Sequence, residues 1–203
     1  MAIVLVRHGE TPGNATRVIQ RPDTPLSPRG VAQAQRLADR LATWEVSMIL
    51  SSDYARARMT AAALQAATGV PLELDPDLRE RNFGDLRGTA YADLDVDPFA
   101  PSYVPPRGES WDDLHARVDR VWARVTATAG RQRGDVVVVT HGLVCHSLVT
   151  HHLALEADAA EGGFGNTSVT VVEPEPPWRV RLLNCTAHLD TDTAHDTRTR
   201  SGL

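Results

Sequence analysis

The sequence predicts an α/β fold, a three-layer α/β/α sandwich in a single domain whose central mixed sheet is mostly parallel. Short apolar runs rich in β-branched residues alternate with longer helical patterns, which is typical of a sheet covered by helices on both faces. The runs are continuous, as expected of strands buried on both sides. A chain of 203 residues is long enough for one well-buried core and does not require a second domain.

Six segments are expected to form the strands of this sheet. They cover residues 2–6, 47–50, 71–74, 135–140, 168–173 and 178–184. The last of them begins by alternating polar and apolar residues, so we expect it nearer an edge of the sheet.

The first long helix is expected in "SPRGVAQAQRLADRLATW", residues 27–44. Ser27 is suited to cap it, and Pro28 is suited to the first helical position. Helical spacing places a set of apolar side chains on one face, namely Val31, Ala34, Leu37, Ala38 and Leu41. We expect this face to pack on the sheet.

Three further helices are expected between or after the strands. The alanine-rich segment 53–69 ends at Gly69, a residue suited to a helix stop. The segment 110–130 has Ser110 as its cap and Gly130 at its end. Residues 141–155, "HGLVCHSLVTHHLAL", follow the strand 135–140 and continue the alternation.

Two segments fall outside this alternation. Residues 91–110 are rich in proline and aromatic residues and are expected to form a lid loop. Residues 189–203 contain almost no apolar side chains and are expected to be disordered. We therefore expect a catalytic domain over 1–188, with a short lid at about 89–110, and a polar tail over 189–203.

Composition excludes several classes of function. A net charge of −5 argues against non-specific binding to nucleic acid or to anionic lipid. No apolar stretch approaches the roughly 18 residues of a membrane span, and the N-terminus lacks the pattern of a signal peptide. We expect a cytoplasmic protein whose Cys145 and Cys185 are buried thiols. The oligomeric state is open, a homodimer included.

Polar residues follow three of the predicted strands. Arg7 and His8 come directly after the first strand, and Arg56 lies about one helical turn beyond the end of the second. His141 and Gly142 follow the strand 135–140. Because ligands of parallel α/β sheets bind beyond the carboxyl ends of the strands, we expect these residues to meet at one edge.

Two guanidiniums and two imidazoles form a pocket suited to phosphate, which arginine binds with forked donors. Two histidines are more than binding requires, and a neutral imidazole can accept a phosphoryl group covalently. The leaving oxygen then needs a proton donor. Glu80 in "LRERNFGDLRG" is one candidate, whereas Glu10, Asp53, Asp85 and Glu109 are other acids in candidate loops.

Motifs along most of the chain resemble those of the histidine phosphatase superfamily, also called the phosphoglycerate mutase-like family. They include "VRHGETPGN" (6–14), "SSDYARARMTAA" (51–62), "LRERNFGDLRG" (78–88), "PRGESWDDLHARV" (106–118) and "VVVVTHGLV" (136–144). The resemblance implies that His8 is the phosphorylated nucleophile and that Glu80 is the general acid. It also implies that the phosphate is held by Arg7, Asn14, Arg56 and His141.

The resemblance also implies that Gln20 binds the substrate. Gly142, beside His141, is expected to line the substrate-binding site. Many relatives have a glycine after this polar residue, whereas Gln20 is followed here by Arg21, to which we assign no role. The family uses neither a metal nor an organic cofactor, and none is expected here. His141 and Cys145, four residues apart on a helix, are too few ligands for a zinc site.

We expect a phosphomonoesterase that acts on a small-molecule phosphomonoester. A mutase, which returns the phosphoryl group to its substrate, is the alternative within enzymes, but mutases of this family carry a longer insertion where this chain has only residues 89–107. A non-catalytic phosphate or phosphoprotein binder is the alternative of another class. Such binders usually lack a catalytic residue, and none is missing here.

Overall fold

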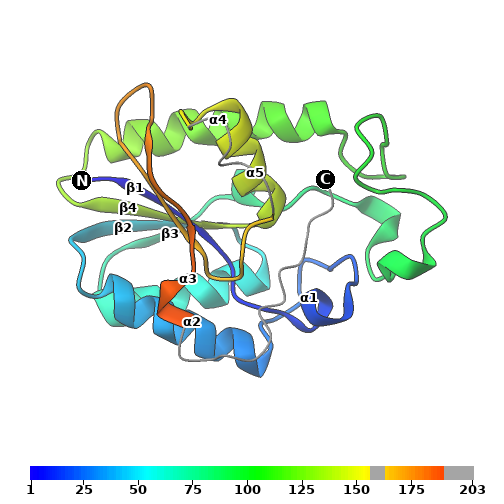
Figure 1. Ribbon diagram of the computed structural model, residues 1–203, viewed down its shortest axis with the longest axis horizontal. Helices are drawn as coiled ribbons and strands as arrows, with labels where there is room; N and C mark the ends of the chain where they lie inside the picture. The colour runs from blue at the N-terminus through cyan, green and yellow to red at the C-terminus, as the bar shows by residue number, and fades with distance from the viewer. Residues whose placement is uncertain (156–162, 190–203) are drawn as a thin grey trace.

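The computed structural model describes residues 1–155 and 163–189, which form helices and a twisted sheet (Figure 1). The described strands make one sheet in the order β3-β2-β4-β1-β5-β6. Its strands are β1 (Ile3–Arg7), β2 (Val46–Ser51), β3 (Leu72–Leu74), β4 (Asp135–Thr140), β5 (Val169–Val172) and β6 (Val180–Cys185). All six predicted strands are present, and β6 lies at an edge as expected.

The sheet is mixed, as predicted. Strands β1, β2, β3 and β4 run parallel to one another, whereas β5 is antiparallel to both β1 and β6. In the centre, Val4 of β1 pairs with Val137 of β4 on one side and Val171 of β5 on the other. A strand with neighbours on both sides and helices on both faces has no solvated surface, which explains its unbroken apolar sequence.

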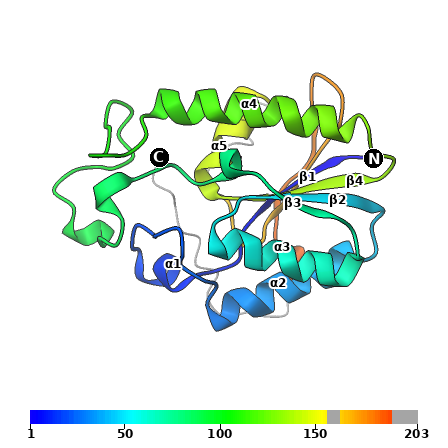
Figure 2. The same ribbon diagram turned by 180° about the vertical axis from the view of Figure 1, so that it is seen from behind.

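Helices cover both faces of the sheet (Figures 1 and 2). Ile3 and Leu5 of β1 point into the core beneath α4 (Trp111–Ala129) and α5 (Gly142–His151). Val4 and Val6 point into the core formed with α2 (Pro28–Leu41) and α3 (Ala55–Thr68). This alternation separates two hydrophobic layers and confirms the three-layer sandwich.

Helix α2 begins as predicted, with Ser27 accepting a hydrogen bond from the backbone N–H of Gly30 and Pro28 in the first helical position. Its buried face contains Ala34, Leu37, Ala38 and Leu41 as predicted, but it lacks Val31 and includes Gly30 and Gln33. Val31 is 51% exposed, whereas Gln33 is buried with the alanines and leucines. Gln33 takes the inner position because its Oε1 accepts a hydrogen bond from the Glu10 N–H, 2.8 Å away.

The remaining helices follow their predicted signals. Helix α3 ends at Gly69, whose φ of 71° is the left-handed conformation that favours glycine. Ser110 and Asp113 form a capping box at the start of α4. A short helix, α1 (Pro12–Thr16), follows β1 and has Thr11 as its cap.

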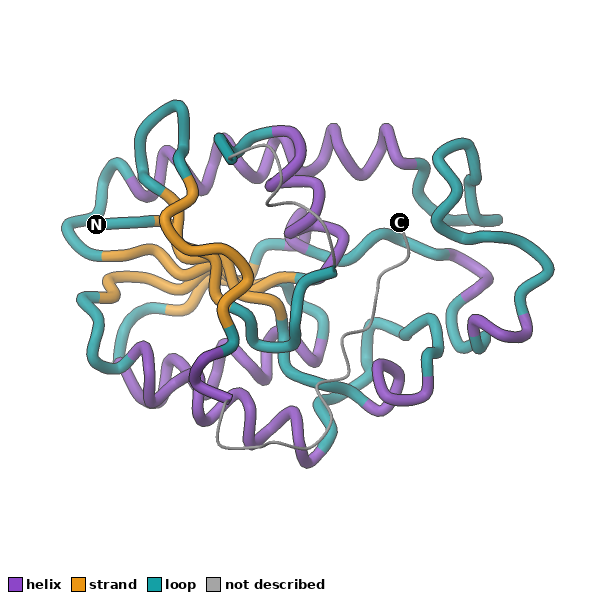
Figure 3. The backbone as a smooth tube through the Cα atoms, viewed as in Figure 1, coloured by secondary structure: helices purple, strands orange, loops and turns teal. Residues whose placement is uncertain are grey.

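The predicted lid segment contains turns and the 3₁₀ helix η3 (Tyr91–Asp93), and it extends beyond the carboxyl ends of the strands (Figure 3). Leu189, the first residue of the predicted tail, ends the 3₁₀ helix η4 (Ala187–Leu189), and residues 190–203 lie outside the described residues. Both cysteines are free thiols, but only Cys145 is buried, because Cys185 lies at the end of an edge strand. No described helix is long and apolar enough to cross a membrane.

Candidate active site

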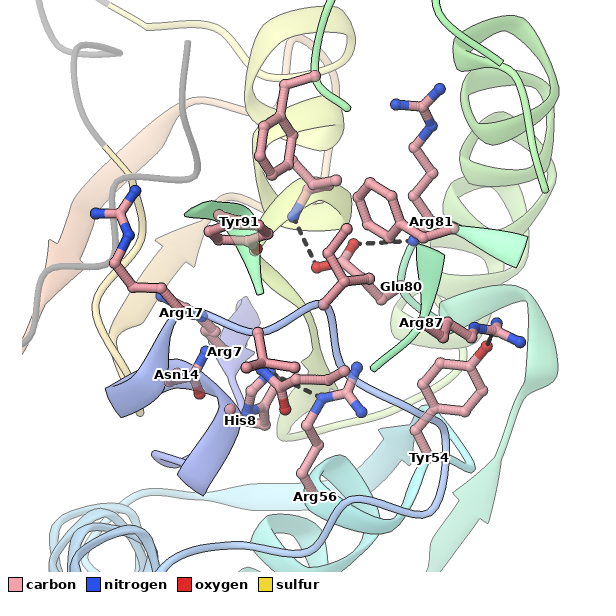
Figure 4. Close-up of a pocket in the computed structure, with 18 residues that line it drawn as sticks. Arg7, His8, Asn14, Arg17, Tyr54, Arg56, Glu80, Arg81, Arg87 and Tyr91 are labelled. Atoms are coloured by element: carbon pink, nitrogen blue, oxygen red, sulfur yellow. Dashed lines mark hydrogen bonds between the residues drawn. The ribbon is translucent and has the colours of Figure 1, made fainter. Parts of the chain in front are cut away.

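The carboxyl ends of the central strands meet at one edge, where they deliver the predicted polar residues. Arg7 at the end of β1 pairs with Thr140 at the end of β4, and Ser51 at the end of β2 pairs with Val139. A cavity of about 60 Å³ lies beyond this edge (Figure 4). Its walls include Arg7, His8, Asn14, Arg56, Glu80 and Gly142.

His8 is held in one orientation at the base of this cavity. Its Nδ1 lies 2.7 Å from the Gly9 carbonyl oxygen and must carry the proton, because a carbonyl oxygen only accepts. Its Nε2 accepts a hydrogen bond from Arg56 Nε at 3.2 Å, drawn as a dashed line in Figure 4. Burial and the charges of Arg56 and Arg7 hold the pKa of His8 well below its ordinary 6.5. At neutral pH the ring is therefore uncharged, with its lone pair on Nε2.

Arg7 and Arg56 place two buried guanidiniums beside this ring. Arg7 Nη1 donates to the Phe164 carbonyl oxygen, and Arg56 Nη1 donates to the Arg21 carbonyl oxygen at 3.1 Å. Burial lowers the pKa of Arg56 to about 10, so the group is still a cation at neutral pH. Two fixed cations beside an uncharged imidazole form a site for an anion.

Glu80 lies on the opposite wall of the cavity in Figure 4, on the segment that follows β3. Its Oε1 accepts from the backbone N–H of Arg81 at 3.0 Å, and its Oε2 accepts from that of Leu143 at 3.3 Å. Burial raises the pKa of Glu80 above its ordinary 4.5, although these two N–H groups and the nearby arginines oppose the shift. A carboxyl group with a raised pKa is suited to giving and taking protons.

His141 lies behind His8 and does not line the cavity. Its ring is 0% exposed, and the two ring centroids are 5.1 Å apart. His141 Nε2 is 2.8 Å from Ser52 Oγ, whereas Nδ1 has no hydrogen-bond partner among the described residues. Burial and the charge of Arg56 lower the pKa of His141 well below 6.5, so it too is uncharged at neutral pH.

The other predicted binding residues take different positions. Asn14 Oδ1 accepts from the N–H of Thr11 and from Asn166 Nδ2, so the amide Nδ2 of Asn14 is the atom able to donate to a ligand. Gln20 lines the cavity and accepts from Thr11 Oγ1 at 2.7 Å. Arg21 is exposed and is absent from the described lining.

The residue pattern that suggested a metal does not assemble into a metal site. Cys145 lies on the buried face of α5, where burial raises its pKa to about 12. Within residues 1–155 and 163–189, no group of three or more His, Cys, Asp or Glu side chains is arranged to hold a metal ion.

A second cavity adjoins the first. Three residues, Tyr54, Glu80 and Arg87, line both cavities and form the partition between them. The far wall of the second cavity carries the ion pairs Arg79–Asp53 and Arg117–Glu109. Glu80 therefore borders both cavities.

The site thus combines two arginines and two histidines at one edge of the sheet. Residues 3–186 match the model of the histidine phosphatase superfamily (branch 1). The chain belongs to this superfamily.

Relatives of this histidine phosphatase superfamily member have been named both as phosphatases and as mutase-like proteins. Glucosyl-3-phosphoglycerate phosphatase of Mycobacterium tuberculosis is 32% identical over 94% of this chain and 97% of its own length. Phosphoglycerate mutase-like protein 4 of Arabidopsis thaliana is 35% identical over 93% of this chain and 86% of its own. A solved mycobacterial glucosyl-3-phosphoglycerate phosphatase in complex with VO3 matches with a TM-score of 0.79 and 32% identity, covering 91% of this chain and 99% of that one.

Sequence reasoning missed Arg81, the residue that fastens the lid of this superfamily member to the site. Its side chain is 1% exposed and donates to the carbonyl oxygens of Pro98, Tyr103 and Glu109 at 2.7 to 3.0 Å. Its guanidinium carbon also lies 4.2 Å from the centroid of the Trp111 ring. Only its place directly after Glu80 could have drawn attention to it. Arg81 thereby links the backbone of the candidate acid to the lid.

The structure shows a packing role for Gly9, the residue after His8. A Cβ on Gly9 would lie 2.7 Å from the Gly30 carbonyl oxygen. The first turn of α2 thus packs directly on the loop that carries His8. Gly30 was not singled out by its sequence context, although a Cβ there would lie 1.9 Å from the Glu10 carbonyl oxygen.

Gly30→Ala is expected to displace the loop that carries His8 and to destabilise the protein. The added methyl group cannot fit without movement of the backbone, which costs on the order of 1–3 kcal/mol or more. Urea unfolding measures this loss. Gly130→Ala is the matched control, because the nearest described atom would be 3.6 Å from its Cβ and its φ is −60°. Equal midpoints for the two variants would contradict the close packing at Gly30.

Proposed function

We propose that this protein is a metal-independent phosphomonoesterase that acts through a phosphohistidine at His8 on small phosphorylated metabolites. The observation that carries the proposal is the fixed ring of His8. Its proton is held on Nδ1 by the Gly9 carbonyl oxygen, and its lone pair is on Nε2 beside two buried arginines. This is the protonation state that a nucleophilic imidazole needs.

In the first step His8 Nε2 attacks phosphorus, and the bond from phosphorus to the ester oxygen breaks. The leaving oxygen takes a proton from Glu80, whose raised pKa favours the protonated form. Arg7 and Arg56 stabilise the charge on the phosphoryl oxygens, and so does the Nδ2 of Asn14. His141 is not part of the cavity lining, so its Nδ1, which has no partner among the described residues, would act as a further donor only once phosphate binding exposes it to the cavity.

In the second step a water molecule attacks phosphorus and gives its proton to the Glu80 carboxylate. The bond from Nε2 to phosphorus breaks, inorganic phosphate is released, and both side chains return to their starting states. A mutase must keep water from its phosphoenzyme. Glu80 borders a second, solvent-open cavity as well as the first, so water is close to the proposed phosphoenzyme, and this supports hydrolysis over mutase chemistry.

A non-catalytic phosphate binder is disfavoured because the acid and the nucleophile are both present and oppositely placed across the cavity. The proposal assigns the catalytic domain to residues 1–188, with the lid from about 89 to 110. Purified protein should be screened against a panel of phosphorylated metabolites for phosphate release without added metal. Release from none of them, with efficient interconversion of phosphoglycerates, would favour the mutase.

Vanadate is expected to inhibit this protein, and EDTA is expected to leave its activity unchanged. Vanadate can adopt the five-coordinate geometry that phosphorus passes through between His8 and water, so it should bind more tightly than phosphate. The charge is stabilised by fixed arginines, which leaves no task for a divalent cation. Inhibition constants for vanadate and phosphate, measured with and without EDTA, test both statements. Loss of activity in EDTA that added metal restores would contradict the proposal.

A further inference from the structure

Arg87 differs from the other arginines around the second cavity. Arg79 and Arg117 each form an ion pair with a carboxylate, with Asp53 and Glu109 respectively. Arg87 forms none with any carboxylate of the described residues. Among these residues its one side-chain hydrogen bond is from Nη2 to Tyr54 Oη at 2.9 Å (Figure 4). Its guanidinium is therefore held in place by a neutral group.

A half-buried guanidinium without an anion is electrostatically unsatisfied. Removing part of its hydration costs free energy that a neutral hydroxyl recovers only in part. Arg56 lies near enough for the charge of Arg87 to contribute to the lowered pKa of Arg56. An anion bound at Arg87 would relieve both effects.

The position of Arg87 relates it to the leaving group rather than to the transferred phosphate. Glu80 must contact the leaving oxygen to protonate it, so the leaving group lies on the Glu80 side of the phosphate. Tyr54, Glu80 and Arg87 line both cavities, so a leaving group held at Glu80 extends past Arg87. Arg7 and Asn14, by contrast, line only the first cavity.

On the basis of the proposed function, we propose that Arg87 binds a second anionic group, a carboxylate or a further phosphate, on the leaving group of the substrate. Tyr54 positions Arg87 through its hydroxyl group. The planar fork of the guanidinium matches either anion with two parallel hydrogen bonds. The preferred substrates are then phosphomonoesters with a second negative charge near the ester.

Two pairs of substrates of similar skeleton test this inference. The pair 3-phosphoglycerate and glycerol 3-phosphate differs by a carboxylate, and the pair fructose 1,6-bisphosphate and fructose 6-phosphate differs by a phosphate. For each pair the measured quantity is the ratio of kcat/KM for the more anionic substrate to that for the less anionic one. We expect the wild-type ratio to be about tenfold or more in at least one pair, and that pair identifies the anion.

Arg87→Gln is expected to lower that ratio about tenfold, mainly through KM, whereas Arg87→Lys should keep a large part of it because the charge is retained. Arg58→Gln, on the exposed side of α3, is the matched control and should leave the ratio unchanged.

A wild-type ratio near one in both pairs would overturn the inference, and so would a high ratio that survives Arg87→Gln. p-Nitrophenyl phosphate is assayed in parallel. Its hydrolysis by the wild-type protein distinguishes failure of the inference about Arg87 from failure of the proposed function. A wild-type protein that hydrolyses none of these esters would refute both.

Discussion

His8→Ala is expected to abolish turnover, with a loss of kcat of at least about 10³-fold. The variant lacks the Nε2 beside Arg56, the atom to which we assign covalent transfer. Steady-state hydrolysis of an aryl phosphate measures the loss. Labelled substrate, quenched without acid because phosphohistidine is acid-labile, should leave a phosphoryl group on His8 of the wild-type protein and none on the variant.

A matched control separates this loss from a general effect of removing a histidine. His152 pairs with Asp119 at the end of α5, away from the cavity, so His152→Ala should retain kcat within a few fold. Activity of His8→Ala comparable with that of His152→Ala would refute the covalent mechanism. Label found on a different residue would show that this residue is the nucleophile and would require a new assignment of the site.

Glu80→Gln is expected to slow hydrolysis of alkyl phosphates by about 10²- to 10⁴-fold, the range typical of general acid catalysis. Aryl phosphates should lose much less in the first step, because their leaving oxygens need little protonation. Glutamine retains the size of the side chain but cannot give a proton. The test is kcat/KM for a series of esters whose leaving groups differ in pKa, in which the variant should show a steeper dependence.

The pH profile provides a second measurement of the same role. Burial raises the pKa of Glu80, so its acid form is present below that pKa and is lost as the pH rises through it. Hydrolysis of alkyl esters by the wild-type protein should therefore decline on the basic side, and Glu80→Gln should lack this decline. Glu73→Gln, on the exposed strand β3, is the control. A uniform loss for all esters with an unchanged profile would assign Glu80 a structural role.

Local patterns in the sequence were sufficient to predict the layers of the fold. Continuous valine-rich runs mark strands that are buried on both faces, and Ser27, Pro28 and Ser110 mark helix starts through interactions within one turn. The exposed Val31 shows the limit of such patterns, because helical spacing alone cannot tell whether residue 31 or residue 33 is buried. That choice depended on the loop at Glu10, which Gln33 binds across 23 positions of sequence.

By itself, the sequence determined which strands carry Arg7, His8, Arg56 and His141 to one edge, because residues at the carboxyl ends of parallel strands must meet there. Only the tertiary structure decided how they are arranged. It placed His141 behind His8 rather than in the cavity wall, brought Gly30 against the loop of Gly9, and used Arg81 to hold the lid. It also left Arg87 without a carboxylate partner among the described residues. These features depend on contacts between segments distant in sequence, whose distances and burial no local pattern contains.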